Sequence, residues 1–232
     1  MKIERALISC WDKQDLLKLA KPLVDHGVEI ISSGGTASYL LQNQIPVTPI
    51  EKITGFKEIL GGRVKTLHPA IHAGILAKRN SEHLQQLETQ GIKPIDLVVV
   101  NLYPFLEKVS EQKSLAEMIE YIDIGGPAML RAAAKNHEFV TTLHHPCQYE
   151  EFLEVWTANK YSVPSEIRLK WAGDIFYYTA YYDSQISRYL DAQKSDEILP
   201  DRFAQFFQKQ QDLRYGENPH QKAAFYQQLP IE

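Results

Sequence analysis

The sequence is poor in cysteine, in basic charge and in long apolar runs, and each shortage excludes a class of protein. Cys10 and Cys147, the only cysteines among 232 residues, are too few for a disulfide framework and indicate a reducing compartment, which we expect to be the cytoplasm. The 25 Lys and Arg stand against 29 Asp and Glu, and this net charge of −4 argues against nucleic-acid binding. The longest apolar run, residues 95–102, contains Asp96 and Asn101 and falls short of a membrane span, so we expect no membrane partner.

Short apolar runs alternate with segments of helical spacing along the sequence. Buried strands are predicted at residues 5–9, 28–32, 47–50, 95–102 and 139–143. Helices are predicted at residues 12–26, 34–43, 82–90, 114–134 (interrupted at 123–127), 148–159 and 165–191. This order indicates a three-layer α/β fold with a mainly parallel sheet. Residues 54–78 show no clear periodicity, and a loop of that length is usually functional or disordered.

A glycine turn follows the second predicted strand. Ser33, Gly34, Gly35 and Thr36 open a predicted helix, where free N–H groups, the helix dipole and the two hydroxyls favour an anion. The same residues would also serve as a plain strand-to-helix turn with a threonine cap. The turn lacks the spacing of a P-loop, so a nucleoside triphosphate is not indicated.

Basic residues lie in two further loops. Lys13 follows the first strand and is expected at the same sheet edge as the glycine turn, whereas Asp12 beside it has the alternative role of a helix N-cap. Arg63 and Lys65 lie in a loop rich in glycine and proline, where they would bind a carboxamide or phosphate, or remain solvated. No cysteine accompanies the nearby histidines, so we expect no metal.

Other polar groups are expected at that edge. Asn101 and Tyr103 end the central strand, and residues 123–126 form a turn after which Pro127 suits the first helical position. Lys135 ends the next predicted helix, where a cation also suits an ordinary C-cap. Their convergence on one sheet edge predicts a ligand cleft.

Four blocks, in order, closely resemble the inosine monophosphate (IMP) cyclohydrolase domain of the bifunctional purine-biosynthesis family PurH (ATIC in animals): ISSGGTA, TGFKEILGGRVKTLHPAIHAGILA, VVVNLYPF and IDIGGPAMLRAAAKNH. The resemblance implies a methylglyoxal-synthase-like (MGS-like) fold with added C-terminal helices and a homodimer. It also implies ring closure of 5-formamidoimidazole-4-carboxamide ribonucleotide (FAICAR) to IMP and water, without metal or cofactor.

The resemblance also implies roles for individual residues. Lys135 would donate and accept the proton, Lys65 and Tyr103 would orient the formyl group, and Asp123 would position Lys135. The implied substrate-binding residues are Trp11, Asp12, Lys13, Ser33, Gly34, Gly35, Thr36, Arg63, Val64, Thr66, Val100, Asn101, Ile124 and Gly125. Trp11 stands where the family has a small hydroxyl residue, so we expect its side chain to turn away from the phosphate.

The family comparison divides the chain into two parts. Residues 1–195 resemble the cyclohydrolase domain with its helical extension, and residues 196–232 resemble a linker and the opening of a folate-dependent formyltransferase domain. Arg214 and Tyr215 belong to that opening. Because the rest of that domain is absent from the sequence, 10-formyltetrahydrofolate is expected to serve no reaction of this chain.

Other functions stay open at this point. A methylglyoxal-synthase-like lyase would share the fold and the glycine turn. A non-catalytic nucleotide-binding module, or a fragment that partners a separate transformylase, would share them too. The block from Arg63 to Pro69 favours the cyclohydrolase, because the lyase and the regulatory module do not need that loop.

Overall fold

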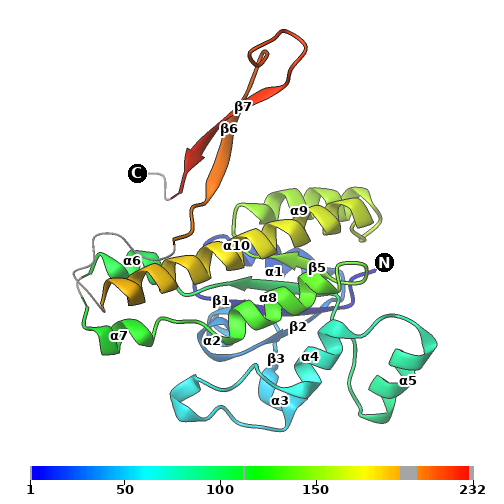
Figure 1. Cartoon of the computed structure of the whole chain (residues 1–232). Helices are drawn as coiled ribbons and strands as arrows, with labels where there is room; N and C mark the ends of the chain where they lie inside the picture. Colours follow the sequence, from blue (N-terminus) through cyan, green and yellow to red (C-terminus); the bar gives the residue numbers. More distant parts are fainter. Residues whose placement is uncertain (1, 112, 194–202, 230–232) are drawn as a thin grey trace. The chain divides into compact units, whose positions relative to one another are not determined.

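The structure is a computed structural model that describes residues 2–111, 113–193 and 203–229 (Figure 1). The chain divides into two compact units, Met1–Thr179 and Ala180–Glu232. The domain boundary expected between residues 195 and 196 lies outside the described residues. Within the described ranges, no helix is long and apolar enough to cross a membrane.

The first unit is built on a parallel sheet. Its described residues form five strands in the order β3-β2-β1-β4-β5. The strands are β1 (Arg5–Cys10), β2 (Glu29–Ser32), β3 (Thr48–Pro49), β4 (Leu97–Asn101) and β5 (Thr141–Leu143). Every residue of β4 is buried, as expected for a central strand covered on both faces. The predicted α/β fold with a parallel sheet is therefore confirmed.

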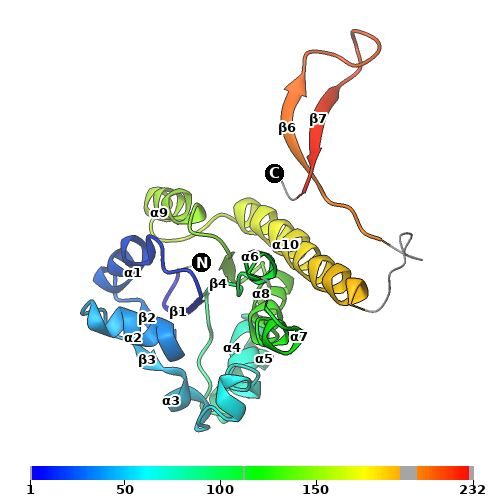
Figure 2. The same ribbon diagram turned by 90° about the vertical axis from the view of Figure 1, so that its left-hand side faces the viewer.

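Helices cover both faces of this sheet. The helices are α1 (Leu16–Asp25), α2 (Gly34–Gln42), α3 (Ile50–Thr54), α4 (Pro69–Leu76), α5 (Ser81–Thr89), α6 (Phe105–Val109), α7 (Leu115–Ile119), α8 (Gly125–Lys135), α9 (Gln148–Ala158) and α10 (Ser165–Ala192). Right-handed crossovers require α1 and α2 to lie on one face and α4 and α8 on the other, as Figure 2 shows. On the first face, Ile8 and Val99 pack with Leu19 of α1 and with Phe152 and Trp156 of α9.

The segment 54–78 differs from the expected irregular loop, because it contains a 3₁₀ turn (Leu60–Gly62) and α4. In α4 an apolar residue stands at almost every position, and Ile71, Gly74 and Ile75 are buried. A helix that is apolar on most sides gives little amphipathic signal, so its sequence did not predict it.

Two expected helix starts are also shifted. The N-cap of α1 is Asp15, and the Asp12 carboxylate instead accepts the N–H of Gln14 at 2.8 Å. The helix α8 begins at Gly125, so Pro127 is its third residue rather than its first.

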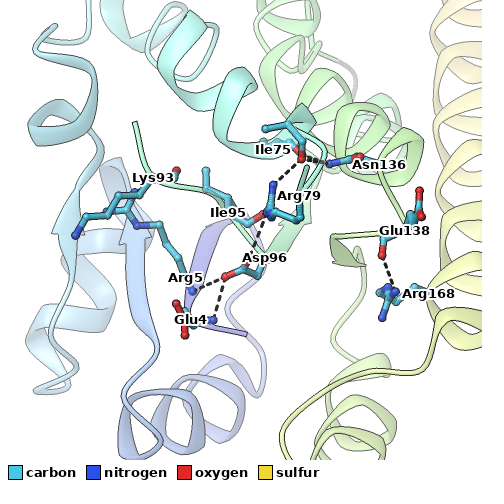
Figure 3. Close-up of polar contacts among 11 residues, drawn as sticks. Glu4, Arg5, Ile75, Arg79, Lys93, Ile95, Asp96, Asn136, Glu138 and Arg168 are labelled. Atoms are coloured by element: carbon cyan, nitrogen blue, oxygen red, sulfur yellow. Dashed lines mark hydrogen bonds and ion pairs between the residues drawn. The ribbon is translucent and has the colours of Figure 1, made fainter. Parts of the chain in front are cut away.

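The amino ends of the central strands are fixed by a buried carboxylate. Asp96 accepts the backbone N–H groups of Glu4 and Arg5 at 3.0 and 3.1 Å, and Arg79 donates to it at 3.2 Å (Figure 3). Because this edge is filled by structural polar contacts, the opposite, carboxyl edge is the one left for a ligand.

The described residues of the second unit contain a hairpin of β6 (Phe207–Leu213) and β7 (Ala223–Gln228), paired antiparallel. Every residue of β6 is exposed. Arg214 and Tyr215 lie in the turn between the strands and are exposed as well.

Candidate active site

The chain connections of the sheet diverge between β1 and β4. From β1 the chain passes to β2 on one side, and from β4 it passes to β5 on the other. Open α/β sheets bind ligands at this point, outside the carboxyl ends of the strands. A cavity of about 750 Å³ lies there and is lined by Cys10 at the end of β1 and Asn101 at the end of β4. This volume suits a small-molecule ligand.

Most of the predicted site residues line this one cavity. They are Trp11, Lys13, Ser33, Gly34, Gly35, Thr36, Arg63, Lys65, Thr66, Asn101, Tyr103, Asp123, Ile124 and Gly125. The residues come from separate stretches of the sequence, and the parallel topology brings them together.

Other predicted residues lie outside the cavity lining. Val100 is buried within β4, and Val64 forms an isolated bridge with Ile59. Asp12 is exposed, and its carboxylate accepts the Gln14 N–H within the turn before α1.

Lys135 is the largest departure from the expected cleft. It is the last residue of α8, ten residues after Gly125, which corresponds to roughly 15 Å along the helix. The next residue, Asn136, donates to the carbonyls of Ile75 at 2.7 Å and Ala77 at 3.0 Å (Figure 3). Lys135 itself is exposed and lines a separate hollow near Phe176. The expectation that Lys135 joins the cleft of its own chain is therefore wrong, because α8 carries it to the opposite edge of the sheet.

The glycine turn presents one buried hydroxyl to the cavity. Ser33 is the N-cap of α2 and is 4% exposed, and its Oγ has no hydrogen-bond partner in the described part of the chain. A buried hydroxyl without a partner is costly, so this atom is suited to a ligand. Thr36 differs from the expectation, because its hydroxyl donates to the Cys10 carbonyl at 2.8 Å and accepts the Cys10 N–H at 3.0 Å. That hydroxyl ties α2 to β1.

The loop with Lys65 and Thr66 packs on the N-termini of two helices. A Cβ added to Gly34, whose φ is +52°, would lie 2.9 Å from Lys65 Nζ. A Cβ added to Gly125 would lie 2.5 Å from Thr66 Oγ1. The positive φ favours glycine at position 34 and the close Thr66 contact favours it at position 125, and this packing places N–H groups of α2 and α8 and the Lys65 ammonium around one space. This is a strongly anion-favouring arrangement.

Asp123 and Tyr103 are two titratable residues that line the cavity. Asp123 Oδ1 accepts the Gly126 N–H at 2.8 Å. Burial raises the pKa of Asp123, against the opposing effects of this N–H, the Lys65 charge and the Tyr103 N–H. Burial also raises the pKa of Tyr103, and the charges of Asp123 and Glu58 raise it further. Tyr103 is therefore a neutral phenol near pH 7, whose hydroxyl is able to donate a hydrogen bond to a ligand.

Asn101 has a structural role that its position in the sequence did not show. Its amide donates to the Asp12 carbonyl at 2.8 Å and accepts the Asp12 N–H at 2.9 Å. This pair of bonds fixes the loop after β1 to the end of β4. The Lys13 ammonium donates to the Trp11 carbonyl at 3.0 Å in the same loop.

Acidic residues of the cavity were missed by the sequence reasoning. The Arg63 guanidinium pairs with the Glu120 carboxylate, and both side chains are more than half exposed. Glu58 Oε2 lies 4.0 Å from Lys65 Nζ. Arg63 and Glu120 are 57 positions apart, so no local pattern indicates this pair. Within the described ranges, no group of three or more His, Cys, Asp or Glu is placed to hold a metal.

Comparisons with known proteins agree with this geometry. Residues 15–128 match the family model described as an MGS-like domain, and residues 133–232 match the one described as AICARFT/IMPCHase bienzyme. Similar proteins include two named bifunctional purine biosynthesis protein PurH. The one from Halalkalibacterium halodurans is 52% identical over 225 residues, and the one from Clostridium kluyveri is 51% identical over 225 residues. These alignments cover 96% and 97% of this chain but 44% of each relative, so the chain spans less than half the length of these relatives.

A solved structure is similar as well. The crystal structure of ForH aligns with a TM-score of 0.74 and 34% identity, covering 82% of this chain and 98% of that chain. The matched models, the PurH relatives and this structure together show that the chain belongs to the PurH family of AICARFT/IMPCHase bienzymes and contains its MGS-like domain.

Proposed function

We propose that the chain is an IMP cyclohydrolase, which closes the ring of FAICAR to give IMP and water. The observation that carries the proposal is the meeting of the α2 and α8 N-termini with Lys65, Tyr103 and Asp123 in one cavity. The naming of the relatives as purine biosynthesis proteins supports the same substrate class.

The α2 end of the cavity is proposed to hold the 5′-phosphate. Ser33 Oγ and the first N–H groups of α2 donate to its oxygens, and Lys13 supplies positive charge. The heterocycle then extends toward Tyr103 and Asp123, on the α8 side of the cavity.

The ring closure is proposed to proceed by acid–base chemistry. The carboxamide nitrogen attacks the formyl carbon of the same molecule, so the cavity has to hold one rotamer. Asp123 accepts the nitrogen's proton, since its raised pKa makes it a stronger base than an ordinary carboxylate. Tyr103 and Lys65 donate to the oxygen that becomes negative, and the first proton converts it to a hydroxyl group on the former formyl carbon. This hydroxyl leaves as water when the former formamide nitrogen gives up its proton and a C=N bond forms in place of the broken C–O bond. No atom changes its oxidation state, so we propose that no redox cofactor takes part.

Incubation of the purified chain with FAICAR tests the proposal. We expect IMP to form, as measured by its ultraviolet absorbance, and no formyl transfer from 10-formyltetrahydrofolate. Folded protein that binds FAICAR without forming IMP would instead favour a non-catalytic nucleotide-binding module.

Binding of IMP tests the phosphate end separately. Lys13→Ala is expected to weaken IMP binding by roughly 1.5–3 kcal/mol in calorimetric titration, because it removes a charge-assisted contact. Unchanged affinity would place the phosphate elsewhere.

We also propose the homodimer that the family resemblance implies. Exposed apolar side chains on the first unit support it, among them Leu76, Leu169 and Phe176. Light scattering is expected to give about twice the chain mass of 26.6 kDa. The turnover of Lys135→Ala tests the dimer further. If each cavity uses residues of one chain only, the variant retains its turnover. Lost turnover with unchanged IMP affinity would mean that Lys135 acts in the cavity of a second copy.

A further inference from the structure

An aromatic wall lines one side of the cavity. Trp11 after β1 and Tyr103 after β4 line the cavity, and the ring of Tyr121, between α7 and α8, packs against Trp11. The Trp11 and Tyr103 rings meet edge to face, with centroids 5.0 Å apart and an interplanar angle of 61°. The Trp11 and Tyr121 centroids are 6.2 Å apart at 77°. Trp11 is thus the ring that joins the other two.

Trp11 is unlike the other tryptophans of the chain. Trp156 and Trp171 are each 1% exposed in the core, whereas Trp11 is 45% exposed. Its indole therefore contributes little to the core, and it packs instead against the rings of Tyr103 and Tyr121. Because this large side chain lines the cavity and adds little to the core, we look for its role in the cavity.

The backbone beneath the aromatic wall is held firmly. The Asn101 side-chain amide bonds both the N–H and the carbonyl of Asp12, the residue after Trp11. The Trp11 carbonyl accepts a hydrogen bond from the Lys13 ammonium. Tyr103 lies only two residues after Asn101. The Trp11–Tyr103 ring contact therefore joins two loops whose backbones are already bonded to each other.

We propose that Trp11 is a positioning residue, which holds the Tyr103 ring in one orientation and shields its hydroxyl from water. The inference rests on the proposed function, in which Tyr103 donates to the reacting oxygen. The environment of the phenol agrees with it, since burial raises the Tyr103 pKa together with the facing charges of Asp123 and Glu58. A ring held by the indole keeps its donor aimed and protonated.

The kinetic test compares Trp11→Ser with Trp11→Phe. We expect Trp11→Ser to lower kcat for IMP formation at least fivefold while KM changes less than twofold, and Trp11→Phe to recover kcat to within twofold of the parent. In a Tyr103→Phe background, Trp11→Ser should have no further effect on kcat, because the ring it positions no longer carries the hydroxyl. Equal loss in both backgrounds, or no loss in either, overturns the proposal.

A second readout does not depend on catalysis. The titration of Tyr103 is followed as the ultraviolet difference between a protein and its Tyr103→Phe counterpart. We expect its midpoint to be at least half a pH unit lower in Trp11→Ser than in the parent, because the phenol gains water. An unchanged midpoint in a folded variant refutes the positioning role. If the parent protein formed no IMP, the proposed function would be refuted, and this titration alone would test whether Trp11 positions the Tyr103 ring.

Discussion

Gly126→Ala tests how tightly the cavity is packed around Asp123. A Cβ at Gly126 would lie 2.6 Å from Leu102 Cδ2 and 2.9 Å from Asp123 Cγ, and closer still to Asp123 Oδ2. The carboxylate has to move, and the bond from the Gly126 N–H to Asp123 Oδ1 is then lost. The substitution therefore removes a hydrogen bond at the N-terminus of α8 and displaces Asp123, the proposed base.

The expected cost follows from two opposing contributions. Loss of a capping bond costs about 1 kcal/mol, and overpacking costs about 1–3 kcal/mol. The better helix propensity of alanine returns up to about 1 kcal/mol. The net loss is about 2 kcal/mol, which lowers Tm by roughly 4–8 °C in a chain of this size.

Gly35→Ala is the matched control. Gly35 is also the second residue of a helix that begins with glycine at the same cavity, but a Cβ there meets nothing within 4 Å. We expect its stability to be unchanged or up to about 1 kcal/mol higher. Urea unfolding followed by fluorescence reports on the first unit, where Trp156 and Trp171 are buried. If Gly126→Ala is as stable as Gly35→Ala, the tight packing at Asp123 is refuted.

Further predictions concern the rest of the first unit. Asn136→Leu is expected to lower the free energy of urea unfolding by about 1–3 kcal/mol, because the Ile75 carbonyl loses its side-chain donor. The Ala77 carbonyl keeps a donor in the Arg79 guanidinium. An unchanged urea midpoint would contradict the expected loss. Burial lowers the pKa of His144 from 6.5 to about 4. The unfolded chain thus takes up a proton below pH 6.5 while the fold does not, and stability falls by up to about 3 kcal/mol between pH 6.5 and 4. His144→Gln should lose less over that range, and an equal loss in parent and variant would assign the acid sensitivity elsewhere. Burial raises the pKa of the Cys10 thiol to about 11, whereas Cys147 is exposed. A thiol reagent at pH 8 should therefore label Cys147 at once and Cys10 only after unfolding, and rapid labelling of a Cys147→Ser protein would contradict the burial.

Much of the fold was predictable because its signals are local. The apolar runs of β1 and β4 and the glycine turn at Ser33 carry their structure in neighbouring residues. The helix α7 is another example, since it begins with a capping box between Ser114 and Glu117, whose Ser-x-x-Glu pattern is local. The helix α4 lacks such a local signal, because apolar residues stand at almost all of its positions and leave no polar face.

The cavity was predictable only in part, since its contacts depend on distant residues. Parallel topology explains why Ser33, Asn101 and Asp123 meet, and the order of strands and helices indicates that topology. The sequence does not show what each side chain is bonded to. Asn101 and Thr36 hold the backbone of the loop and the strand beside them, although each also looked like a ligand contact. The position of Lys135 is set by the length of α8, which the motif around it does not reveal.

The turnover of Lys65→Ala tests whether this cavity closes the FAICAR ring. The variant removes the ammonium that lies beside Gly34 at the N-terminus of α2 and leaves the phenol and the carboxylate in place. We expect the parent chain to form IMP and the folded variant to be slower by about 10²–10³-fold, the range for loss of one donor to a developing oxyanion. An equally fast variant would show that the chemistry takes place outside this cavity.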